Sequence, residues 1–394
     1  MQPDPLVPGP PPPPLTRLGA ADRRWRDHVR AFAEKEIRPL SAEMDRTGTL
    51  DPGLRQQLFA SGLTSVAIPL EYGGLGGGLF QVVLAIEETA RVDAGVAVAV
   101  DVHNALVVAT ILRTAGGDQR RRYLPLLASA KLGAFAISEE QAGSDAFALR
   151  TTAHSEPGAF VLNGRKRWTS NAAQADVFLV FATDPEGRGI SAFLVDRDTP
   201  GLSVVHRTEQ LGVRAASTAD LVLQDVRVRV GQCLGGVGGG RTLAAEALDV
   251  GRLGIAAQLV GLAQGALEQA TEYARSREQF GQRIAGYQGV QFTLARMRVD
   301  IEAARVVLYN ATRIFEDGAD RLEQARQAAM AKYLAAEAAE RTASSAVEIL
   351  GGNGYTRDYP VERIYRDAKA GKIYEGTSNM LLRTIAATLT GEGS

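Results

Sequence analysis

Near the C-terminus, the segment "KIYEGTSN" at residues 372–379 places one carboxylate, Glu375, between an aromatic residue and a glycine. Ile373 and Tyr374 are expected to shield this carboxylate from water, and burial raises the pKa of a carboxyl group. Gly376 allows a ligand or the backbone to approach closely, because glycine has no side chain. These features suit a general base. The alternative is an ordinary helix start capped by one of the two hydroxyl residues that follow, and the eight residues alone favour it.

Two other segments combine small and polar residues in patterns that suit a ligand. In "AISEEQAGSD", residues 136–145, a strand ends in a loop whose Ser144 and backbone amides can cradle a phosphate or a flavin edge. The segment "EILGGNGYTRDYPVERIYRDAK", residues 348–369, predicts a helix that ends at glycines and a second helix after Pro360. Each segment alone is more typical of a helix end or a surface turn.

Several common active-site motifs are missing from the sequence. No G-x-G-x-x-G follows a predicted strand, and there is no G-x-x-x-x-G-K-[ST], H-E-x-x-H or G-x-S-x-G. This argues against a Rossmann dehydrogenase, a P-loop enzyme and a simple serine hydrolase.

The composition narrows the class of protein further. Lys plus Arg number 44 against 45 Asp plus Glu, so no charge excess drives binding to nucleic acid or to an anionic membrane. The single cysteine, Cys233, excludes an intrachain disulfide and a cysteine-rich zinc site, and predicts a reducing, cytoplasmic location. The four histidines lie dozens of residues apart without ligand spacing, so no metal site is expected.

The hydrophobic periodicity changes twice along the chain. We expect a disordered Pro-rich tail at 1–18, a helical domain at 19–131, a β domain at 132–240 with a possible Asn163–Gly164 turn, and a helical domain at 241–394. The apolar stretch at 95–112 is interrupted by Asp101, His103 and Asn104, which favours a buried helix over a membrane span. A stripe with alternating spacings of three and four indicates an antiparallel helical bundle. Its members are Leu294, Met297, Ile301, Ala304, Leu308, Ala311 and Phe315.

The two loop segments, in this order and followed by "IYEGTS", resemble the acyl-CoA dehydrogenase family from about residue 19 to 390. The stretch "LDVGRLGIAAQLVGLAQGALEQATEYARSREQFGQ" is similar to the short-chain, butyryl type. The resemblance implies an α+β fold with a helical N-terminal domain, a central β-barrel or sandwich domain and a C-terminal four-helix bundle. It also implies FAD as cofactor and a homo-oligomer, with a tetramer expected.

Residues are carried over from the family position by position. Glu375 matches the catalytic base. The positions that match the flavin site are Phe135, Ile137, Ser138, Ser144, Trp168, Ser170 and Thr377. The positions that match an adenine and pyrophosphate site supplied by a neighbouring subunit are Arg277, Phe280, Glu348, Gly351 and Gly352. Substrate contacts are expected from Ser144, Asp249, Arg252, Tyr374 and Gly376.

The implied reaction is the α,β-dehydrogenation of an acyl thioester, carried on CoA or on a carrier protein, to a trans-2-enoyl thioester. Glu375 takes the α-proton, its backbone N–H and a flavin ribityl hydroxyl hold the thioester oxygen, and flavin N5 takes the β-hydride. An electron-transferring flavoprotein is the expected acceptor. Some family members carry the base at the position of Gly251, where glycine cannot serve. A flavin oxidase or monooxygenase and a non-catalytic binding module on the same scaffold remain alternatives.

Overall fold

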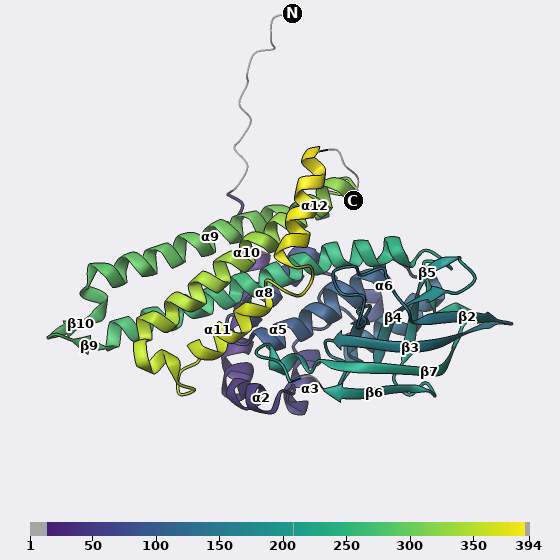
Figure 1. The fold of residues 1–394 in the computed structure, drawn as a ribbon. Coiled ribbons are helices and arrows are strands. Elements are labelled where there is room, and N and C mark those ends of the chain that lie inside the picture. The colour runs from purple at the N-terminus through teal and green to yellow at the C-terminus, as the bar shows by residue number, and fades with distance from the viewer. Residues whose placement is uncertain (1–13, 208, 391–394) are drawn as a thin grey trace, which may run out of the picture.

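A computed structural model describes residues 14–207 and 209–390, and their helices and strands follow one another as helical, β and helical regions (Figure 1). The expected disordered tail lies for the most part outside the described residues. The first helical region contains α1 (Ala20–Phe32), α2 (Ser41–Thr47), α3 (Pro52–Ala60), α4 (Leu79–Ala90), α5 (Ala94–Asp101), α6 (Ala109–Thr114) and α7 (Gly117–Ser129).

The apolar stretch at 95–112 is a buried helix, as predicted. It consists of α5, a π-helical segment (Val102–Val108) and α6, and residues 94–108 are all buried. This helical stretch and α8 are long and apolar enough to cross a membrane by composition alone. Both lie 89% buried inside the protein, which is how core helices of a globular fold behave.

The β region forms one eight-stranded sheet in the order β6-β7-β3-β2-β4-β5-β8, with β1 pairing in parallel with β4. Its strands are β1 (Gly133–Ala136), β2 (Thr152–Glu156), β3 (Ala159–Thr169), β4 (Val177–Asp184), β5 (Gly189–Asp196), β6 (Leu202–Arg207), β7 (Ala219–Arg229) and β8 (Cys233–Leu234). The apolar run "VFLVFA" is buried on both faces of the sheet, which explains why it shows no alternation.

The predicted Asn163–Gly164 turn is wrong. Both residues lie inside β3, where the pairing with β7 shifts register between Leu162 and Gly164. Glycine is required there for close approach, since a Cβ on Gly164 would lie 2.4 Å from Oγ1 of Thr151. The β2–β3 connection turns instead at Gly158, whose φ is +73°.

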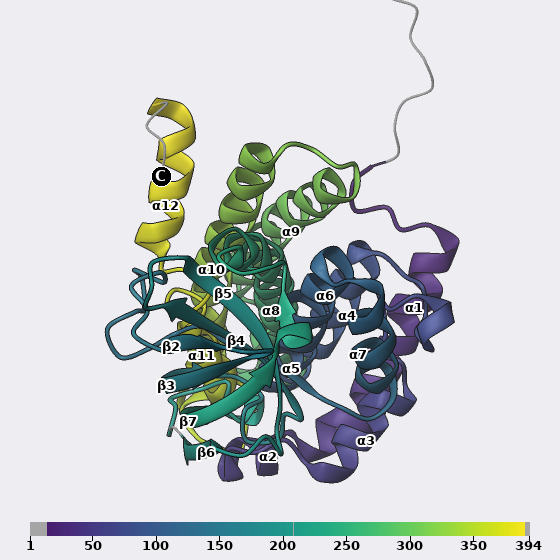
Figure 2. The same ribbon diagram turned by 90° about the vertical axis from the view of Figure 1, so that its right-hand side faces the viewer.

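The C-terminal region packs three long antiparallel helices and two short ones. They are α8 (Gly240–Ser276), α9 (Gln288–Glu316), α10 (Arg321–Leu350), α11 (Val361–Ala370) and α12 (Ser378–Thr390), with a small β9–β10 hairpin (Glu278–Gln279 and Gln282–Arg283) after α8. The predicted stripe on α9 faces the core: its five central members are buried and its two ends are partly buried against the core. In both views α12 extends beyond the other helices (Figures 1 and 2).

Helix α8 packs against both the sheet and the N-terminal helical region. Its N-terminus contacts β5, where a Cβ on Gly240 would lie 2.7 Å from the Ile190 carbonyl oxygen. Its middle crosses α4 so closely that a Cβ on Gly261 would lie 2.0 Å from the carbonyl oxygen of Glu87. Both helical regions and the sheet therefore share one support, and the predicted three-part α+β fold is confirmed.

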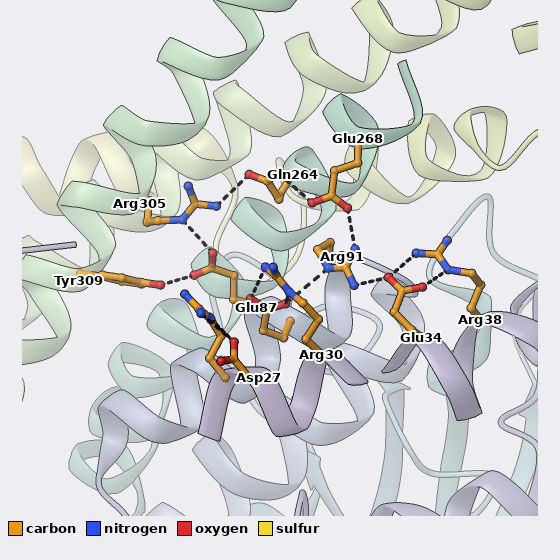
Figure 3. A network of polar contacts seen from close by, with 12 residues as sticks. Asp27, Arg30, Glu34, Arg38, Glu87, Arg91, Gln264, Glu268, Arg305 and Tyr309 are labelled. Atoms are coloured by element: carbon orange, nitrogen blue, oxygen red, sulfur yellow. Dashed lines mark hydrogen bonds and ion pairs between the residues drawn. The ribbon is translucent and has the colours of Figure 1, made fainter. Parts of the chain in front are cut away.

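Charged side chains also join the two helical regions, in a network between α1, α4, α8 and α9 (Figure 3). Arg305 Nε donates to Glu87 at 2.8 Å, and the Tyr309 hydroxyl donates to the same carboxylate at 2.9 Å. Arg91 binds Glu268 at 2.6 Å and also pairs with Glu34. Glu87, Arg91, Glu268, Arg305 and Tyr309 of this network line a polar cavity of about 390 Å³.

Candidate active site

The turn between α11 and α12 holds Glu375 in an unusual backbone conformation. Its φ is +52°, and Gly376 follows with φ +96°. A left-handed conformation is costly for a residue with a side chain and persists only where its surroundings hold it. Thr377 Oγ1 accepts from the N–H of Met380 at 3.4 Å, so the capped helix start considered from the sequence exists beside the carboxylate and does not replace it.

One carboxylate oxygen of Glu375 is buried without a partner. This Oε2 atom is inaccessible and forms no hydrogen bond among the described residues. The space next to it exists because residue 251 is glycine: a Cβ there would lie 3.0 Å from this oxygen and 2.6 Å from Cδ2 of Leu106. Burial raises the pKa of Glu375 to about 7, although the charges of Arg252 and Lys332 act to lower it.

The expected source of this burial is only partly correct. Ile373 is 61% exposed and does not cover the carboxylate, because the turn directs this side chain outward. Tyr374 does point inward, and its hydroxyl donates to Oε1 of Gln258 at 2.9 Å. The apolar shield is supplied instead by α8 and by Leu106, which are distant in sequence.

A second buried carboxyl group, Asp101 on α5, faces the same side of α8. It is fully buried, and neither of its oxygens has a hydrogen-bond partner among the described residues. A Cβ on Gly254 would lie 1.7 Å from its Oδ1 atom, and Gly254 is one helical turn from Gly251. Burial and the nearby charge of Glu375 raise the pKa of Asp101 well above its usual value.

Three further charged groups surround the base from α8 and α10. Asp249, predicted together with Arg252 for substrate contact, accepts from Arg252 Nη1 at 2.7 Å. Burial raises the pKa of Asp249 to about 6, although Arg252 acts to lower it. Arg252 also lies against the base loop, with Nη2 3.8 Å from the place of a Cβ on Gly376. Lys332 of α10 donates to the Gly376 carbonyl oxygen at 2.7 Å.

Most residues predicted for the flavin lie together at the ends of β1 and β3, whereas Thr377 lies in the base loop before α12. Phe135 and Ile137 are buried, and the backbone of Ser138 accepts from the N–H of Arg167 at 2.8 Å. This brings the 136–145 loop beside the end of β3, where Trp168 is 53% exposed with φ +57°. Ser144 is exposed in the loop, and Ser170 is partly exposed just after β3.

A buried ion pair anchors this loop. Lys166 Nζ donates to Glu139 at 2.6 Å and to the Ile137 carbonyl oxygen at 3.1 Å. Glu139 also accepts from the backbone N–H groups of Arg150 and Thr151. Although burial acts to raise it, the charge of Lys166 and these hydrogen bonds lower the pKa of Glu139 to about 2. This ion pair therefore fixes the start of the 136–145 loop, where the loop leaves the sheet.

The remaining predicted cofactor residues lie far from these strand ends. Arg277 and Phe280 follow the far end of α8, a helix of 37 residues that is about 55 Å long, and Phe280 is 96% exposed. Glu348, Gly351 and Gly352 lie at the end of α10 and are exposed as well. Figure 1 shows the β9–β10 tip and the sheet at opposite ends of the molecule.

Backbone strain marks several of these positions. Seven non-glycine residues of the described chain have positive φ, and three of them are the predicted site residues Trp168, Phe280 and Glu375. Strained backbone tends to cluster at functional sites. A fourth, Asn171, ties the sheet to α5 by donating to the carbonyl oxygens of Ala99 and Gly133, both at 3.0 Å.

Sequence reasoning missed Lys332 and Gln258, and noted Asp101 only as a break in an apolar run. All three are fully buried next to the base loop. A signal existed for two of them: Asp101 is a lone charge between valines, and Lys332 is the one positive charge in the alanine-rich run "AAMAKYLAAEAA". An isolated charge in an apolar helix rarely stays buried without a reason.

Comparisons with known proteins extend over the whole site. Residues 20–131, 134–226 and 238–390 match the acyl-CoA dehydrogenase N-terminal, middle and C-terminal domains. The chain is 43% identical over 382 residues to the mitochondrial short/branched chain specific acyl-CoA dehydrogenase of Rattus norvegicus, covering 96% of this chain and 88% of the relative.

Solved structures with the same fold include two whose names state different activities. The butyryl-CoA dehydrogenase from Megasphaera elsdenii has a TM-score of 0.91 and 36% identity, covering 95% of this chain and 99% of its own. A prolyl acyl carrier protein oxidase has a TM-score of 0.89 and 31% identity, covering 95% of this chain and 100% of its own.

Proposed function

The chain belongs to the acyl-CoA dehydrogenase family and is an FAD-dependent oxidoreductase, and we propose that Glu375 removes the α-proton of a short-chain acyl thioester. The observation that carries this proposal is the buried, unpartnered Oε2 atom against Gly251. A base is most effective when its pKa lies near the working pH, and burial raises that of Glu375 to about 7.

The same residue supplies a hydrogen-bond donor for the substrate. Among the described residues, the backbone N–H of Glu375 has no backbone or side-chain partner, while those of Tyr374 and Ser378 are bonded. An N–H group fixed next to the base is suited to hold the thioester oxygen, where negative charge develops as the α-proton leaves. The left-handed turn at residues 375–376 sets this N–H relative to the carboxylate.

The residues at the sheet edge fit an FAD ring system. The half-exposed Trp168, the anchored 136–145 loop and the buried Phe135 at the start of this loop supply aromatic, small and hydroxyl groups. Thr169 Oγ1 is buried there without a partner among the described residues. Ser138, Ser144 and Ser170 would donate and accept hydrogen bonds. When bound, FAD supplies the acceptor for the hydride from the substrate β-carbon.

A second copy of the chain is required to complete the cofactor site in this proposal. Arg277 and Phe280 follow the C-terminal end of α8, and this tip lies at the opposite end of the molecule from the sheet (Figure 1). Their exposure, together with that of Val299 and Leu389, supports contact with another subunit. We propose a homo-oligomer, a tetramer, in which these residues reach a neighbour's adenine and pyrophosphate groups.

The electron acceptor and the location remain proposals. An electron-transferring flavoprotein is the acceptor that the family resemblance implies. The cytoplasmic location rests on the single cysteine, and the rat relative is named mitochondrial. An oxidase that passes electrons to oxygen is the second candidate, because one protein with the same fold is named an oxidase.

Anaerobic titration of the yellow, FAD-loaded protein with acyl-CoA thioesters tests the proposal. Butyryl-CoA and 2-methylbutyryl-CoA are expected to bleach the flavin absorbance with formation of the enoyl product. A protein that binds FAD but is bleached by none of a panel of acyl-CoA and acyl carrier protein thioesters would refute it. Hydrogen peroxide formed at the rate of turnover in air would identify the oxidase instead.

A further inference from the structure

Lys332 on α10 is a fully buried lysine beside the proposed base. Its ammonium group donates to the Gly376 carbonyl oxygen at 2.7 Å. Its helical neighbours Ala328, Ala329, Ala331 and Ala335 are buried alanines, so they give the ammonium group no polar partner. Burial lowers the pKa of this lysine to about 7, against the charge of Glu375, which acts to raise it.

The loop that carries Glu375 must be stabilised by contacts from outside the loop. Glu375 and Gly376 are both left-handed, and few backbone hydrogen bonds close the loop around them: Tyr374 N–H to the Ala370 oxygen at 3.1 Å and Ser378 N–H to the Lys372 oxygen at 3.3 Å. A strained turn with so few bonds of its own relaxes unless the surrounding structure holds it.

Helix α10 holds this loop at two points. On the inside, Lys332 binds the carbonyl oxygen directly after the base. On the outside, Lys372 at the start of the loop pairs with Glu337 at 2.9 Å and with Glu340 at 2.5 Å. The two lysines thus anchor the same loop to the same helix, but only Lys332 is fully buried and close enough to Glu375 to affect its pKa.

We propose that Lys332 is a positioning residue for Glu375. Lys332 holds the Gly376 carbonyl group and so fixes the turn that directs both the carboxylate and the N–H of Glu375. This inference rests on the proposed role of Glu375. The ammonium group adds an electrostatic effect, because a nearby positive charge favours the ionised carboxylate.

The other charged groups around the base define what removal of Lys332 leaves behind. Arg252 on α8 remains as the cation that acts on Glu375. Asp249 is paired with Arg252, and Asp101 on α5 adds a second carboxyl group nearby. Without Lys332, one positive charge is lost and both carboxyl groups stay, so the pKa of Glu375 rises.

The test measures the rate of flavin reduction by butyryl-CoA in FAD-loaded Lys332→Met. The rate is measured by rapid mixing at pH values from 6 to 9. We expect the reduction rate to fall roughly tenfold to 10²-fold, as misplacement of a catalytic group does. The midpoint of its pH dependence is expected to move upward. Binding of butyryl-CoA, read from the perturbed flavin spectrum, should stay within about threefold, so the loss appears in the rate and not in affinity.

Two further variants separate the effect of the hydrogen bond to the Gly376 carbonyl group from the effect of the positive charge, and provide a control. Lys332→Gln keeps a donor for the Gly376 carbonyl group without the charge, and it is expected to recover part of the rate while keeping the shifted pH dependence. Lys35→Met removes an exposed lysine that pairs with Glu36 on the surface, and both its rate and its pH dependence are expected to match the unmodified protein within about twofold.

An unchanged rate and pH dependence in Lys332→Met overturns the inference. If that variant does not fold or loses FAD, Lys332→Gln decides: a wild-type rate with a wild-type pH midpoint overturns the inference equally. Glu375→Gln distinguishes the two proposals. Full activity in Glu375→Gln ends the proposed function, whereas loss of activity there with a normal Lys332→Gln ends only the role of Lys332.

Discussion

The pocket around Glu375 and the charge network of Figure 3 both place carboxylates against α8, but with opposite electrostatic results. In the network, hydrogen bonds from Arg38 and Arg91 lower the pKa of Glu34 to about 2. In the pocket, burial raises the pKa of Glu375 to about 7 and that of Asp101 well above its usual value. Paired carboxylates stay ionised and hold domains together, whereas a buried carboxylate without a hydrogen bond becomes a base that can take a proton near neutral pH.

One feature of α8 separates the two environments. At the network, its side chains Gln264 and Glu268 reach across to Arg305 and Arg91. At the pocket, Gly251 and Gly254 present no side chain, so Glu375 and Asp101 lie against bare backbone. The absence of partners is therefore built into the helix by residue type.

The largest expected effect comes from Glu375→Gln, which keeps the size of the side chain but cannot take a proton. The rate of flavin reduction by butyryl-CoA should fall by at least ~10²-fold, the lower end of what a positioned base contributes. FAD content should be retained, and butyryl-CoA should still perturb the flavin spectrum. The exposed Glu71→Gln serves as control. Near-normal bleaching in Glu375→Gln would place the base elsewhere.

Removing one partner from the charge network should lower the free energy of unfolding and leave the rate of flavin reduction unchanged. Arg305→Met leaves the buried Glu87 carboxylate with Tyr309 as its remaining partner in the network. Breaking a buried pair in this way costs about 3 kcal/mol, which denaturant unfolding of the FAD-loaded protein measures. Arg46→Met, at an exposed pair with Glu43, is expected to leave the midpoint unchanged. If folded Arg305→Met lost flavin reduction but kept its stability, the network would contribute to the reaction and not to the stability of the fold.

A methyl group placed between α8 and the base should displace the carboxylate. In Gly251→Ala the new Cβ would lie 2.6 Å from Leu106 Cδ2 and 3.0 Å from Glu375 Oε2, so these groups must shift. We expect flavin reduction to slow on the order of tenfold, within the 10²-fold that a displacement of about 1 Å can cause. Gly289→Ala on α9, where a Cβ meets nothing within 4 Å, is the matched control. Equal rates in the two variants would show that the contact with Gly251 does not position the base.

The smallest effect is the pH dependence of the unmodified protein. With a pKa of about 7, the ionised fraction of Glu375 rises about tenfold between pH 6 and pH 8, because only the carboxylate accepts a proton. The rate of flavin reduction should rise over this window and level off above it. The residual rate of Glu375→Gln should be flat there. A rate that falls as the pH rises from 6 to 8 would contradict the assignment of this pKa to the base.

Local sequence was sufficient to predict many of the elements, whereas Glu375 is proposed as the base from the family resemblance. The α9 stripe, the apolar run of β4 and the glycines after α10 indicate their structures through residue type and spacing alone. The Asn163–Gly164 prediction failed because glycine serves a close approach between strands as well as a turn, and the two uses look alike in sequence. The role expected of Ile373 failed because the direction of a side chain in a strained turn depends on what holds the turn.

The sequence by itself determined that Glu375 stands in a turn between two helices and that Gly251 cannot act as a base. Only the tertiary structure decided that one oxygen of this carboxylate is buried without a partner and that Asp101 lies near it. It also decided that Lys332, 44 residues before Gly376, binds the carbonyl group of that glycine. The reason is physical. A helix follows from neighbours along the chain, whereas a pKa depends on burial and on charges through space, and those come from α5, α8 and α10.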